Sequence, residues 1–272
     1  MPSSAAAQAR VALVTGSTDG LGREVARRLA ATGAHVIVHG RNRERGEALV
    51  AEIKRSGTGS ATFYAADFAS LDQVRRLAHD VLRDHERLDL VVNNAGIWLN
   101  SSAERQLSED GHELHFAVNY LAGFLLTRML LPLMVETGGG RIVHVSSTAQ
   151  APLVFDNVML ERDYSGSRAY AQSKLAQVLF TMDLAAELEG TGIVVAALHP
   201  ATLMDTQMVE EAGIRPRATV AEGADAVMHV IAADYDSGQY FNGARPARAN
   251  AQAYDPAARE KLRRLSTELT GG

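Results

Sequence analysis

The chain has 272 residues, enough for one large α/β domain or two small ones, and 46% of them are hydrophobic, as in an ordinary globular enzyme. Its formal net charge of -5 argues against a nucleic-acid-binding protein, which would normally present a basic face. The absence of cysteine excludes metal binding and redox chemistry by thiols.

The first nine residues lack both a basic start and a long apolar stretch, so we expect a short flexible arm over residues 1–9 rather than a secretory signal. We also expect no membrane-spanning segment, because uninterrupted apolar runs stay short of the roughly 20 residues that cross a bilayer. The sequence therefore predicts a cytoplasmic protein with no membrane partner.

Apolar runs rich in β-branched residues alternate with helical patterns as far as about residue 240. The strands are expected at residues 11–15, 35–39, 61–65, 88–93, 141–146 and 193–198. The helices are expected near residues 22–32, 43–56, 71–86, 109–136 and 168–189. Several strands are apolar at consecutive positions, as in strands covered on both faces. With no linker or repeat, the pattern predicts a single α/β domain over residues 1–272, a doubly wound, Rossmann-type parallel sheet flanked by helices.

A glycine-rich loop, Thr15 to Gly22, follows the first expected strand and opens into the first helix. Its glycines are Gly16, Gly20 and Gly22, which is not the Gly-x-Gly-x-x-Gly spacing of the standard dinucleotide fingerprint. Glycine lets the backbone approach a pyrophosphate closely, and the helix N-terminus supplies free amides and a positive dipole end. A tight strand–helix turn without a ligand is the alternative, but the position between first strand and first helix favours a phosphate-binding loop.

The glycine spacing resembles that of the short-chain dehydrogenase/reductase family, in its single-domain branch. A second motif in the family's order, Asn93-Asn94-Ala95-Gly96, follows the fourth expected strand, although by itself it could be a plain turn. The resemblance implies a nicotinamide cofactor held by both motifs. The residues that it assigns to the cofactor are Gly16, Ser17, Thr18, Asp19, Gly20, Leu21, Gly22, Asn94, Ala95 and Gly96.

The end of the second strand distinguishes NAD from NADP. An NAD enzyme usually carries an acid there for the ribose 2′-hydroxyl, whereas this chain has Gly40 followed by Arg41. Arginine grips a phosphate with two charge-assisted hydrogen bonds, so we expect NADP as the cofactor. Arg43 and Arg45 are expected to be solvated residues of a helix start. By resemblance Asp67 bonds the adenine, although it could equally cap a helix. Two neighbours assigned to the same site are Asn42 and Phe68.

Tyr170 and Lys174 lie four residues apart, so on a helix they share one face. A free tyrosine titrates near ~10 and is a poor acid–base group at neutral pH. A lysine charge ~4–5 Å away at an effective dielectric of ~20 would lower that pKa by about two to three units. Lysine is rare in this chain, which otherwise uses arginine. Although Tyr-x-x-x-Lys also occurs by chance, we expect Tyr170 to donate and accept the proton, with Lys174 as its partner.

Two further residues complete the expected catalytic set. Ser147 follows the strand expected at 141–146, where a hydroxyl can polarise a substrate oxygen. Ser146 is the rival; the family alignment puts the functional serine second, so we expect Ser146 to point into the sheet. By resemblance, Asn119 distorts the long helix and holds a water in a proton relay with Lys174. Alternatively, Asn119 only bonds a neighbouring carbonyl.

The chain departs from the commonest family pattern in two places. The segment between Ser147 and Tyr170 is longer than usual, and residues 149–168 are similar in length and layout to the corresponding segment of retinol-dehydrogenase-like members. His199-Pro200-Ala201 stands where Pro-Gly is more frequent. In the family this loop meets the nicotinamide amide, which implies cofactor contacts by Pro200 and Thr202, with Thr206 as the alternative threonine.

Methionine and aromatic residues in loops suit a flexible, apolar substrate pocket. The substrate-facing candidates are Trp98, Gln150, Phe155, Val158, Met159, Tyr164, Met204, Met208 and Val209. Alternatively, they only pack a lid on itself. We expect hydride transfer between NADP(H) and a lipophilic or aromatic ketone, aldehyde or alcohol. A cofactor-binding regulator would lack part of the catalytic set, and an extended-branch sugar epimerase would have another glycine spacing.

His112 and His115 have no third ligand at a metal-binding spacing, so we expect helix-surface residues and no metal. The helices at 109–136 and 168–189 carry too many apolar residues for one buried face. In the family these helices pair with their symmetry mates, which implies a homodimer or homotetramer. Alternatively, the C-terminal segment around 254–269 covers the second face.

Overall fold

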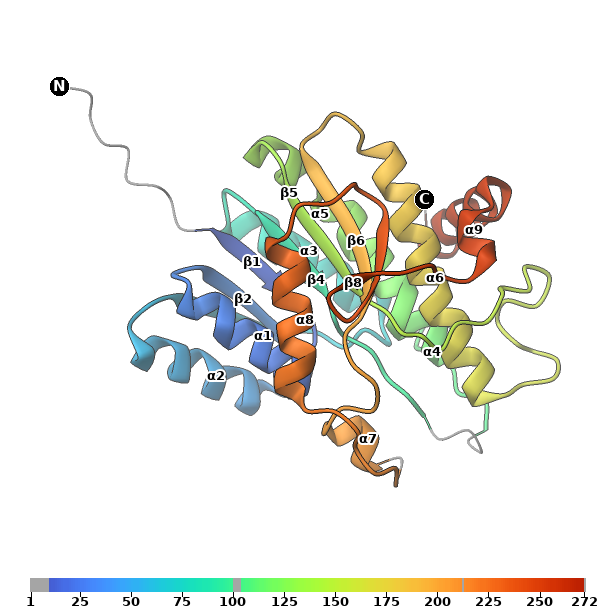
Figure 1. Ribbon diagram of the computed structural model, residues 1–272, viewed down its shortest axis with the longest axis horizontal. Helices are drawn as coiled ribbons and strands as arrows, with labels where there is room; N and C mark the ends of the chain where they lie inside the picture. Colours follow the sequence, from blue (N-terminus) through green and yellow to red (C-terminus); the bar gives the residue numbers. More distant parts are fainter. Residues whose placement is uncertain (1–9, 100–103, 212, 272) are drawn as a thin grey trace.

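The computed structural model describes residues 10–99, 104–211 and 213–271, arranged around one eight-stranded sheet (Figure 1). The sheet has the order β3-β2-β1-β4-β5-β6-β7-β8, and all neighbouring strands are parallel except β7 and β8. The strands are β1 Val11–Val14, β2 His35–Gly40, β3 Ser60–Ala65, β4 Leu90–Asn93, β5 Gly140–Val145, β6 Ile193–His199, β7 Gln239–Asn242 and β8 Arg245–Pro246. The strand order reverses between β1 and β4, which is where doubly wound sheets bind their ligands.

Helices cover both faces of the sheet (Figure 1). On one face lie α1, α2 and α8; on the other lie α3, α5 and α6, with α9 packed against α6. The helices are α1 Gly20–Ala31, α2 Arg43–Ser56, α3 Leu71–Asp84, α4 Leu114–Phe116, the π-helix η1 Ala117–Leu121, α5 Ala122–Thr137, α6 Gly166–Glu187, α7 Gln207–Glu211, α8 Val220–Ala232, the 3-10 helix η2 Ala251–Tyr254 and α9 Pro256–Leu269.

The alternation of side chains along the strands produces the two layers. In β1, Leu13 packs on the side of α3, α5 and α6, while Val14 packs on the side of α1, α2 and α8, and both are fully buried. A strand that is covered on both faces needs apolar residues at consecutive positions. The prediction of a doubly wound, mostly parallel α/β sheet is therefore confirmed.

The differences from the predicted elements lie mainly in the C-terminal part. The strands β7 and β8 have four and two residues, too short for a periodic signal, and the sequence analysis did not predict them. It also missed α8 and α9. The long helix expected near 109–136 begins only at Leu114 and is interrupted by the π-helical turn η1.

The continuous helical stretch Leu114–Thr137 is long and apolar enough to cross a membrane by length and composition, so the expectation that no segment meets that criterion is wrong. Within the fold, 67% of its apolar window is buried. It packs against α3 and α6, which is the position of a core helix. A core helix of a globular domain passes the same test, and the packing accounts for its composition.

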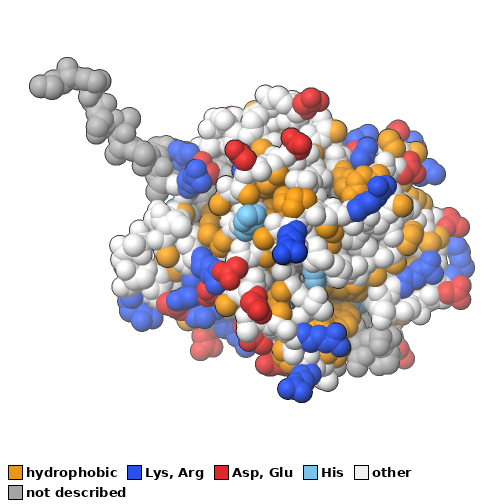
Figure 2. Space-filling model, viewed as in Figure 1, with side chains coloured by type: hydrophobic (Ala, Val, Ile, Leu, Met, Phe, Trp, Pro, Cys, Tyr) orange, Lys and Arg blue, Asp and Glu red, His pale blue; other side chains and the backbone are white. Residues whose placement is uncertain are grey.

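Charged side chains of both signs are interspersed on the face shown in Figure 2. Elsewhere in the described chain, and regardless of the face, exposed charges form pairs such as Arg128 with Glu187 at 2.6 Å and Arg43 with Glu47 at 3.3 Å. Exposed pairs of this kind each contribute little to stability, about 0–1 kcal/mol. The mixture of signs agrees with the small net charge of the chain.

The second apolar face of α6 is covered by α9. Leu262 of α9 and Leu184 of α6 are both fully buried, and Phe180 is 5% exposed. The contact also has a polar bond, because Arg263 of α9 donates to Asp183 of α6 at 2.7 Å. The argument that an uncovered apolar face requires a second copy of the chain is therefore wrong, and the alternative of coverage by the C-terminal segment is what the fold contains. Oligomeric state stays a prediction without that support.

We expect Leu262→Asp to detach α9, because a carboxylate cannot stay charged in this apolar contact without a partner. The free energy of unfolding should fall by about 2 kcal/mol or more, and the uncovered face of α6 should make the protein self-associate. Urea unfolding and light scattering against the parent measure both effects. Thr267→Asp, on the exposed face of the same helix, is the matched control. Equal masses and stabilities for the two variants would contradict the prediction.

Candidate active site

The turn between β1 and α1 packs backbone to backbone against the loop after β4. A Cβ atom at Gly22 would overlap with the carbonyl oxygen of Gly16, and one at Gly16 would lie 2.8 Å from the Cα of Ala95. Asn94 locks the contact, since its Nδ2 donates to the carbonyls of Thr15 and Gly16 at 2.9 and 3.1 Å. The two predicted motifs thus form one rim at the N-terminus of α1, the setting in which proteins bind a pyrophosphate.

Two side chains of this turn point into the fold rather than toward the rim. Ser17 is fully buried and donates to the carbonyl of Val14 at 2.7 Å. Leu21 is buried in the core on the side of α8. Ser17 and Leu21 were both predicted to contact the cofactor, and only their backbone atoms can do so.

Arg45 compensates the charge of Asp19 at the mouth of the rim. Asp19 caps α1 by accepting from the amide of Gly20 at 2.7 Å. Arg45 is exposed at the start of α2, as predicted, and it also donates to Asp19 at 2.8 Å and to Gln207 of α7 at 3.1 Å. Asn42 caps α2 by accepting from the amide of Arg45 at 3.0 Å. These bonds join α2, the glycine turn and α7.

The end of β2 leaves no room for an acidic side chain. A Cβ atom at Gly40 would lie 2.6 Å from both Oγ1 and Cγ2 of Thr18. Arg41 follows, with 70% of its side chain exposed and its Nη1 3.7 Å from Asp67. Asp67 also accepts from the amide of Ala69 at 2.9 Å, so it caps a turn as well as facing Arg41. A larger residue at position 40 would require the Thr18 side chain to move, and Arg41 presents an exposed guanidinium beside this position.

His39, which the sequence analysis did not single out, joins β2, β3 and the glycine turn. The amide of Gly16 donates to its Nδ1 at 3.2 Å, so the ring proton is on Nε2, 3.1 Å from the carbonyl of Ala66. Burial lowers the pKa of His39 to about 4, and the ring stays neutral. Phe68 stacks on it with centroids 4.4 Å apart and is buried, so the side chain of Phe68 belongs to the core and not to the predicted cofactor site. A histidine near the end of an otherwise apolar strand is the signal in the sequence that could have singled out His39.

Ser147, Tyr170 and Lys174 converge at the carboxyl end of β5. Tyr170 and Lys174 lie one turn apart on α6, and the hydroxyl of Ser147 lies close enough to that of Tyr170 to lower the tyrosine pKa. Lys174 is 5% exposed; its Nζ donates to the carbonyl of Val145 at 2.9 Å and lies 5.7 Å from the centroid of the Tyr170 ring. The structure thus brings these three predicted residues together.

The neighbouring serine faces away from this cluster. Ser146 is buried and donates to the carbonyl of Lys174 at 2.7 Å. It therefore points to the backbone of α6. The sequence analysis had expected it to point into the sheet. Its hydroxyl is engaged in holding α6 on β5, which favours Ser147 as the serine that meets a substrate.

Asn119 lies at the centre of the π-helical turn η1, so the helix is distorted at this residue. Its Oδ1 accepts from the amide of Ile97 at 2.7 Å, and its Nδ2 donates to the carbonyl of Ile97 at 3.1 Å and to Ser173 at 2.9 Å. A Cβ atom at Gly96 would lie 3.2 Å from Asn119 Oδ1 and 3.4 Å from Lys174 Nζ. Asn119 therefore ties the loop after β4 to α6 beside the lysine.

Comparisons with known proteins agree with this geometry. The family profile of the short chain dehydrogenases matches residues 10–216. The chain belongs to the short-chain dehydrogenase family. It is 33% identical to human retinol dehydrogenase 14 over 96% of this chain and 86% of that protein. A structure from Mycobacterium paratuberculosis matches with a TM-score of 0.80 at 29% identity, covering 96% of this chain and 93% of that one. A short chain dehydrogenase from Escherichia coli CFT073 complexed with NADPH matches with a TM-score of 0.69 at 27% identity, covering 87% and 97%.

Burial dominates the protonation of the catalytic pair in this short-chain dehydrogenase. It lowers the pKa of Lys174 to about 7. It also raises the pKa of Tyr170, and the nearby hydroxyl of Ser147 opposes that rise. The expected lowering of the tyrosine pKa by a lysine charge is therefore not what the structure contains, because desolvation disfavours both charged forms.

The loop after β6 runs from the catalytic lysine back over the glycine turn. His199 lies with its Nε2 3.0 Å from Thr202, and its pKa is lowered by burial and by the charge of Lys174. Farther along, Thr206 packs on the glycine turn, 3.3 Å from where a Cβ atom of Gly20 would lie. Of the two candidate threonines, Thr202 therefore lies nearer to Lys174, and Thr206 lies at the glycine turn.

One of the predicted substrate-facing residues lies beside Tyr170, and two others meet at Glu113. The ring centroid of Trp98 lies 5.9 Å from that of Tyr170. Tyr164 and Met159, both from the long segment before α6, contact Glu113, with the Tyr164 hydroxyl 3.5 Å from its Oε1. Glu113 in turn bonds His115, whose ring centroid lies 6.4 Å from that of Tyr170. We refer to Trp98, Met159 and Tyr164 as the apolar wall.

Gln150 has a different role from the predicted one. Its Nε2 donates to the carbonyl of Ser147 at 2.8 Å, and its Oε1 accepts from the amide of Asn250 at 2.7 Å. The hydroxyl of Tyr240 donates to the same carbonyl of Ser147 at 2.9 Å. Gln150 thus helps to fix the backbone of Ser147.

Other candidates for the substrate lie elsewhere. Val158 and Val209 are buried, at 6% and 5% exposure, and do not face a cleft. Met204 packs against α8 on the opposite layer from α6. Phe155 packs against the core on the side of α6, and Met208 lies half-buried on α7. The positions of these residues in the sequence did not show which way each side chain points.

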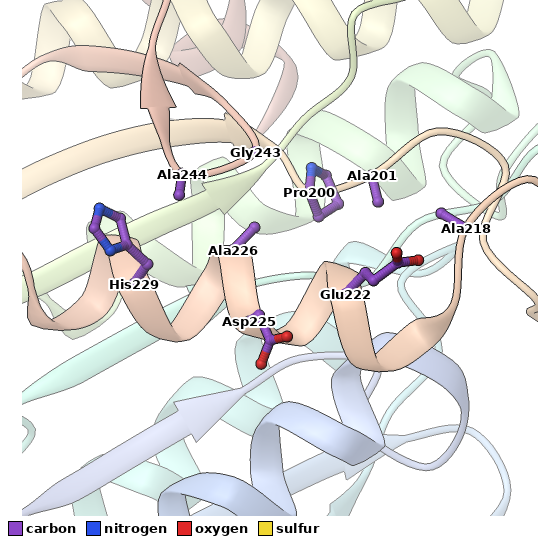
Figure 3. Close-up of a pocket in the computed structure, with 9 residues that line it drawn as sticks. All are labelled: Pro200, Ala201, Ala218, Glu222, Asp225, Ala226, His229, Gly243 and Ala244. Carbon is purple, nitrogen blue, oxygen red and sulfur yellow. The ribbon is translucent and has the colours of Figure 1, made fainter.

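A pocket of about 510 Å³ lies between α8 and the loops after β6 and β7 (Figure 3). Pro200 and Ala201 line it, but none of the four catalytic candidates does. Its carboxylates already have partners, because Glu222 completes the N-terminal cap of α8 and Asp225 pairs with Arg28. The carboxylates of this pocket are therefore engaged in holding α8 in place.

His115 is fully buried, so the expectation of a surface position is wrong for this residue, while His112 is half-buried. The reason is that Glu113, itself 1% exposed, accepts from His115 Nδ1 at 2.9 Å and draws the ring inward. Within the part of the chain that the structure describes, no group of three or more His, Cys, Asp or Glu residues could hold a metal ion.

The buried ammonium of Lys174 predicts a specific pH dependence of stability. Unfolded lysine titrates near ~10.4, so the unfolded chain binds more protons than the folded one between about pH 7 and pH 10, and the free energy of unfolding rises with pH in this window. Between about pH 6.5 and pH 9.5, the free energy of unfolding of the parent should rise by about 3 kcal/mol relative to that of Lys174→Met. Urea unfolding across this range measures it. Lys261→Met, at an exposed lysine, should show the same pH dependence of the free energy of unfolding as the parent. The same pH dependence in Lys174→Met and the parent would count against the prediction.

Proposed function

We propose that this short-chain dehydrogenase is an NADP(H)-dependent oxidoreductase that acts on a carbonyl or alcohol group of a lipophilic small molecule. The observation that carries the proposal is the convergence of Ser147, Tyr170 and the buried Lys174 at the carboxyl end of β5, next to the glycine rim. A tyrosine hydroxyl beside a serine hydroxyl can pass a proton to a substrate oxygen that both hydroxyls contact.

The residues around the rim fit a dinucleotide. The Gly16–Gly22 turn and the Asn94–Gly96 loop would hold the pyrophosphate, and the loop from Pro200 to Thr206 would cover it. A bound NADP(H) would supply or accept the hydride. Pro200 is buried, so it would contribute shape and no side-chain hydrogen bond.

The protein groups provide the proton and hold it at defined atoms. Ser147 would orient the substrate oxygen while Tyr170 donates its hydroxyl proton in reduction and accepts one in oxidation. Lys174, with a pKa of about 7, can take up and release a proton near neutral pH. Asn119 holds the loop after β4 against α6 beside Lys174. Proton transfer by such positioned groups typically contributes about 10²–10⁴-fold in rate.

Two observations support NADP over NAD. The side chain of Thr18 occupies the space into which an acidic residue at position 40 would extend, and Arg41 is exposed beside it. The matching Escherichia coli structure is a complex with NADPH. The apolar wall of Trp98, Met159 and Tyr164 and the names of the retinol dehydrogenase relatives support a lipophilic substrate.

Arg41→Ala should weaken the preference for NADPH over NADH. The guanidinium would bind only the 2′-phosphate, so the gap in binding free energy should narrow by roughly 1–3 kcal/mol, while NADH affinity stays unchanged. Fluorescence titration with both nucleotides measures the two affinities. Arg43→Ala, which removes an equally exposed arginine paired with Glu47, should leave the gap as in the parent. Equal affinities of the unmodified protein for NADPH and NADH would refute the assignment.

Tyr170→Phe should abolish turnover without weakening NADPH binding, because only the hydroxyl is lost. NADPH oxidation with a panel of carbonyls that includes retinal is the readout, and a rate within a few-fold of the parent would assign the proton to another group. Ser147→Ala should reduce the rate severely, by about 10²-fold or more, and Ser146→Ala only mildly. The reverse order of the two serine variants would exchange their roles.

A further inference from the structure

A buried carboxylate stands behind the catalytic tyrosine and is not needed for the proposed chemistry. Glu113, just before α4, is 1% exposed, and His115 is fully buried. The His115 ring lies edge-on to that of Tyr170, with centroids 6.4 Å apart. Charged residues are almost never buried without partners, so each bond of this glutamate is informative.

The carboxylate of Glu113 is an acceptor for donors from two segments of the chain. Its Oε2 accepts from the amide of Phe116 at 2.8 Å. Its Oε1 accepts from His115 Nδ1 at 2.9 Å and faces the Tyr164 hydroxyl at 3.5 Å. Burial and the charge of Glu113 raise the pKa of Tyr164 to about 12, so Tyr164 keeps the proton that it directs at Glu113.

His115 extends the connection to the loop after β4. The amide of Leu99 donates to its Nε2 at 3.1 Å, which places the ring proton on Nδ1, toward Glu113. Trp98 precedes this amide and lies beside Tyr170, 5.9 Å between ring centroids. Glu113 therefore connects, through one carboxylate, the Trp98–Leu99 backbone to the segment that carries Tyr164.

The same segment is also held at Met159. The backbone amide of Glu113 lies 3.4 Å from the Met159 sulfur, and Arg105 donates to the Met159 carbonyl at 2.8 Å. Trp98, Met159 and Tyr164 are the residues of the apolar wall. The position of the whole wall thus depends on bonds made at or next to Glu113.

We propose that Glu113 is a positioning residue that sets the width of the substrate cleft. This width determines whether a bulky apolar carbonyl binds productively, and it has little effect on the binding of a small carbonyl. This inference rests on the proposed oxidoreductase function, but not on the identity of the physiological substrate. Glu113 does not touch the reacting atoms. It acts through His115, Tyr164 and the backbone of Trp98–Leu99.

A carboxylate is required at this position because all its neighbours are donors. In Glu113→Gln one oxygen becomes an amide nitrogen, which would point a donor at either the Phe116 amide or the His115 Nδ1 proton. One of these buried donors then loses its acceptor, and the wall must move to satisfy it. The substitution changes shape very little, so it tests the bonds rather than the packing.

The first arm of the test compares substrates of two sizes. With NADPH, Glu113→Gln should lose about tenfold in kcat/KM for retinal, mostly through KM, and less than about threefold for propanal. Glu109→Gln makes the same substitution at an exposed glutamate nearby and should match the parent with both. Tyr164→Phe removes the bond between Tyr164 and Glu113 and should lower kcat/KM for retinal by about threefold. Equal losses on both substrates, or none, would overturn the proposal.

The second arm needs no turnover. Trp98 is the one tryptophan of the chain, so its fluorescence reports directly on the wall. Acrylamide should quench it more strongly in Glu113→Gln than in the parent or in Glu109→Gln, at equal far-ultraviolet circular dichroism. Unchanged quenching would overturn the role of Glu113. If the parent reduces no carbonyl at all, the proposed function fails, and the quenching arm alone still decides whether Glu113 holds the wall.

Discussion

Two hydrogen bonds clamp α6 onto the end of β5, and the position of each catalytic group follows from them. Lys174 Nζ donates to the carbonyl of Val145 at 2.9 Å, and the Ser146 hydroxyl donates back to the carbonyl of Lys174 at 2.7 Å. Because the two bonds run in opposite directions across one contact, α6 cannot rotate or slide without breaking one of them in a buried setting, where an unpaired group is expensive. Tyr170, one turn earlier, is thereby held at Ser147. The clamp also keeps the lysine charge out of water, and a strongly shifted pKa in such a place is typical of functional sites.

The cofactor half of the site is built on a separate set of contacts. The glycine turn is fixed by Asn94 from one side and by His39 from the other, so its geometry does not depend on α6. The two halves meet because parallel strands end at the same edge of the sheet and the strand order reverses between β1 and β4. Asn119 is the direct link, since it bonds Ile97 after β4 and Ser173 on α6. A dinucleotide that spans both halves would therefore meet two rigid supports.

The features that sequence reasoning predicted are those that depend on local spacing. A strand–glycine–helix turn, a Tyr-x-x-x-Lys face and consecutive apolar strand residues each follow from a few neighbouring positions, and the fold class and the Tyr170–Lys174 pair were predictable for that reason. The choice of Ser147 came from the resemblance to the family. Contacts between distant segments were not. Periodicity indicated that α6 has a second apolar face but not that α9 covers it. His115 looked like a surface residue because the ring that packs on it, Tyr170, is far along the chain. Met204 and Phe68 follow strands, but only the fold shows that they turn toward the core.

The wall of the cleft is rigid for a reason that differs from the rigidity of the catalytic cluster. Leu160 and Asp163, with φ of 48° and 55°, are in the left-handed region, which non-glycine residues adopt only when their surroundings compel them. Those surroundings include the Gln172 side chain, which donates to the carbonyl of Val158 at 2.7 Å, and Arg105 on the carbonyl of Met159. A segment held this firmly is not the flexible, adaptable lid that its methionine and aromatic composition indicated. Its hydrogen bonds are also largely separate from the clamp between α6 and β5. Substitutions in this segment can therefore reshape the cleft for a different substrate while the proton-transfer groups stay in place.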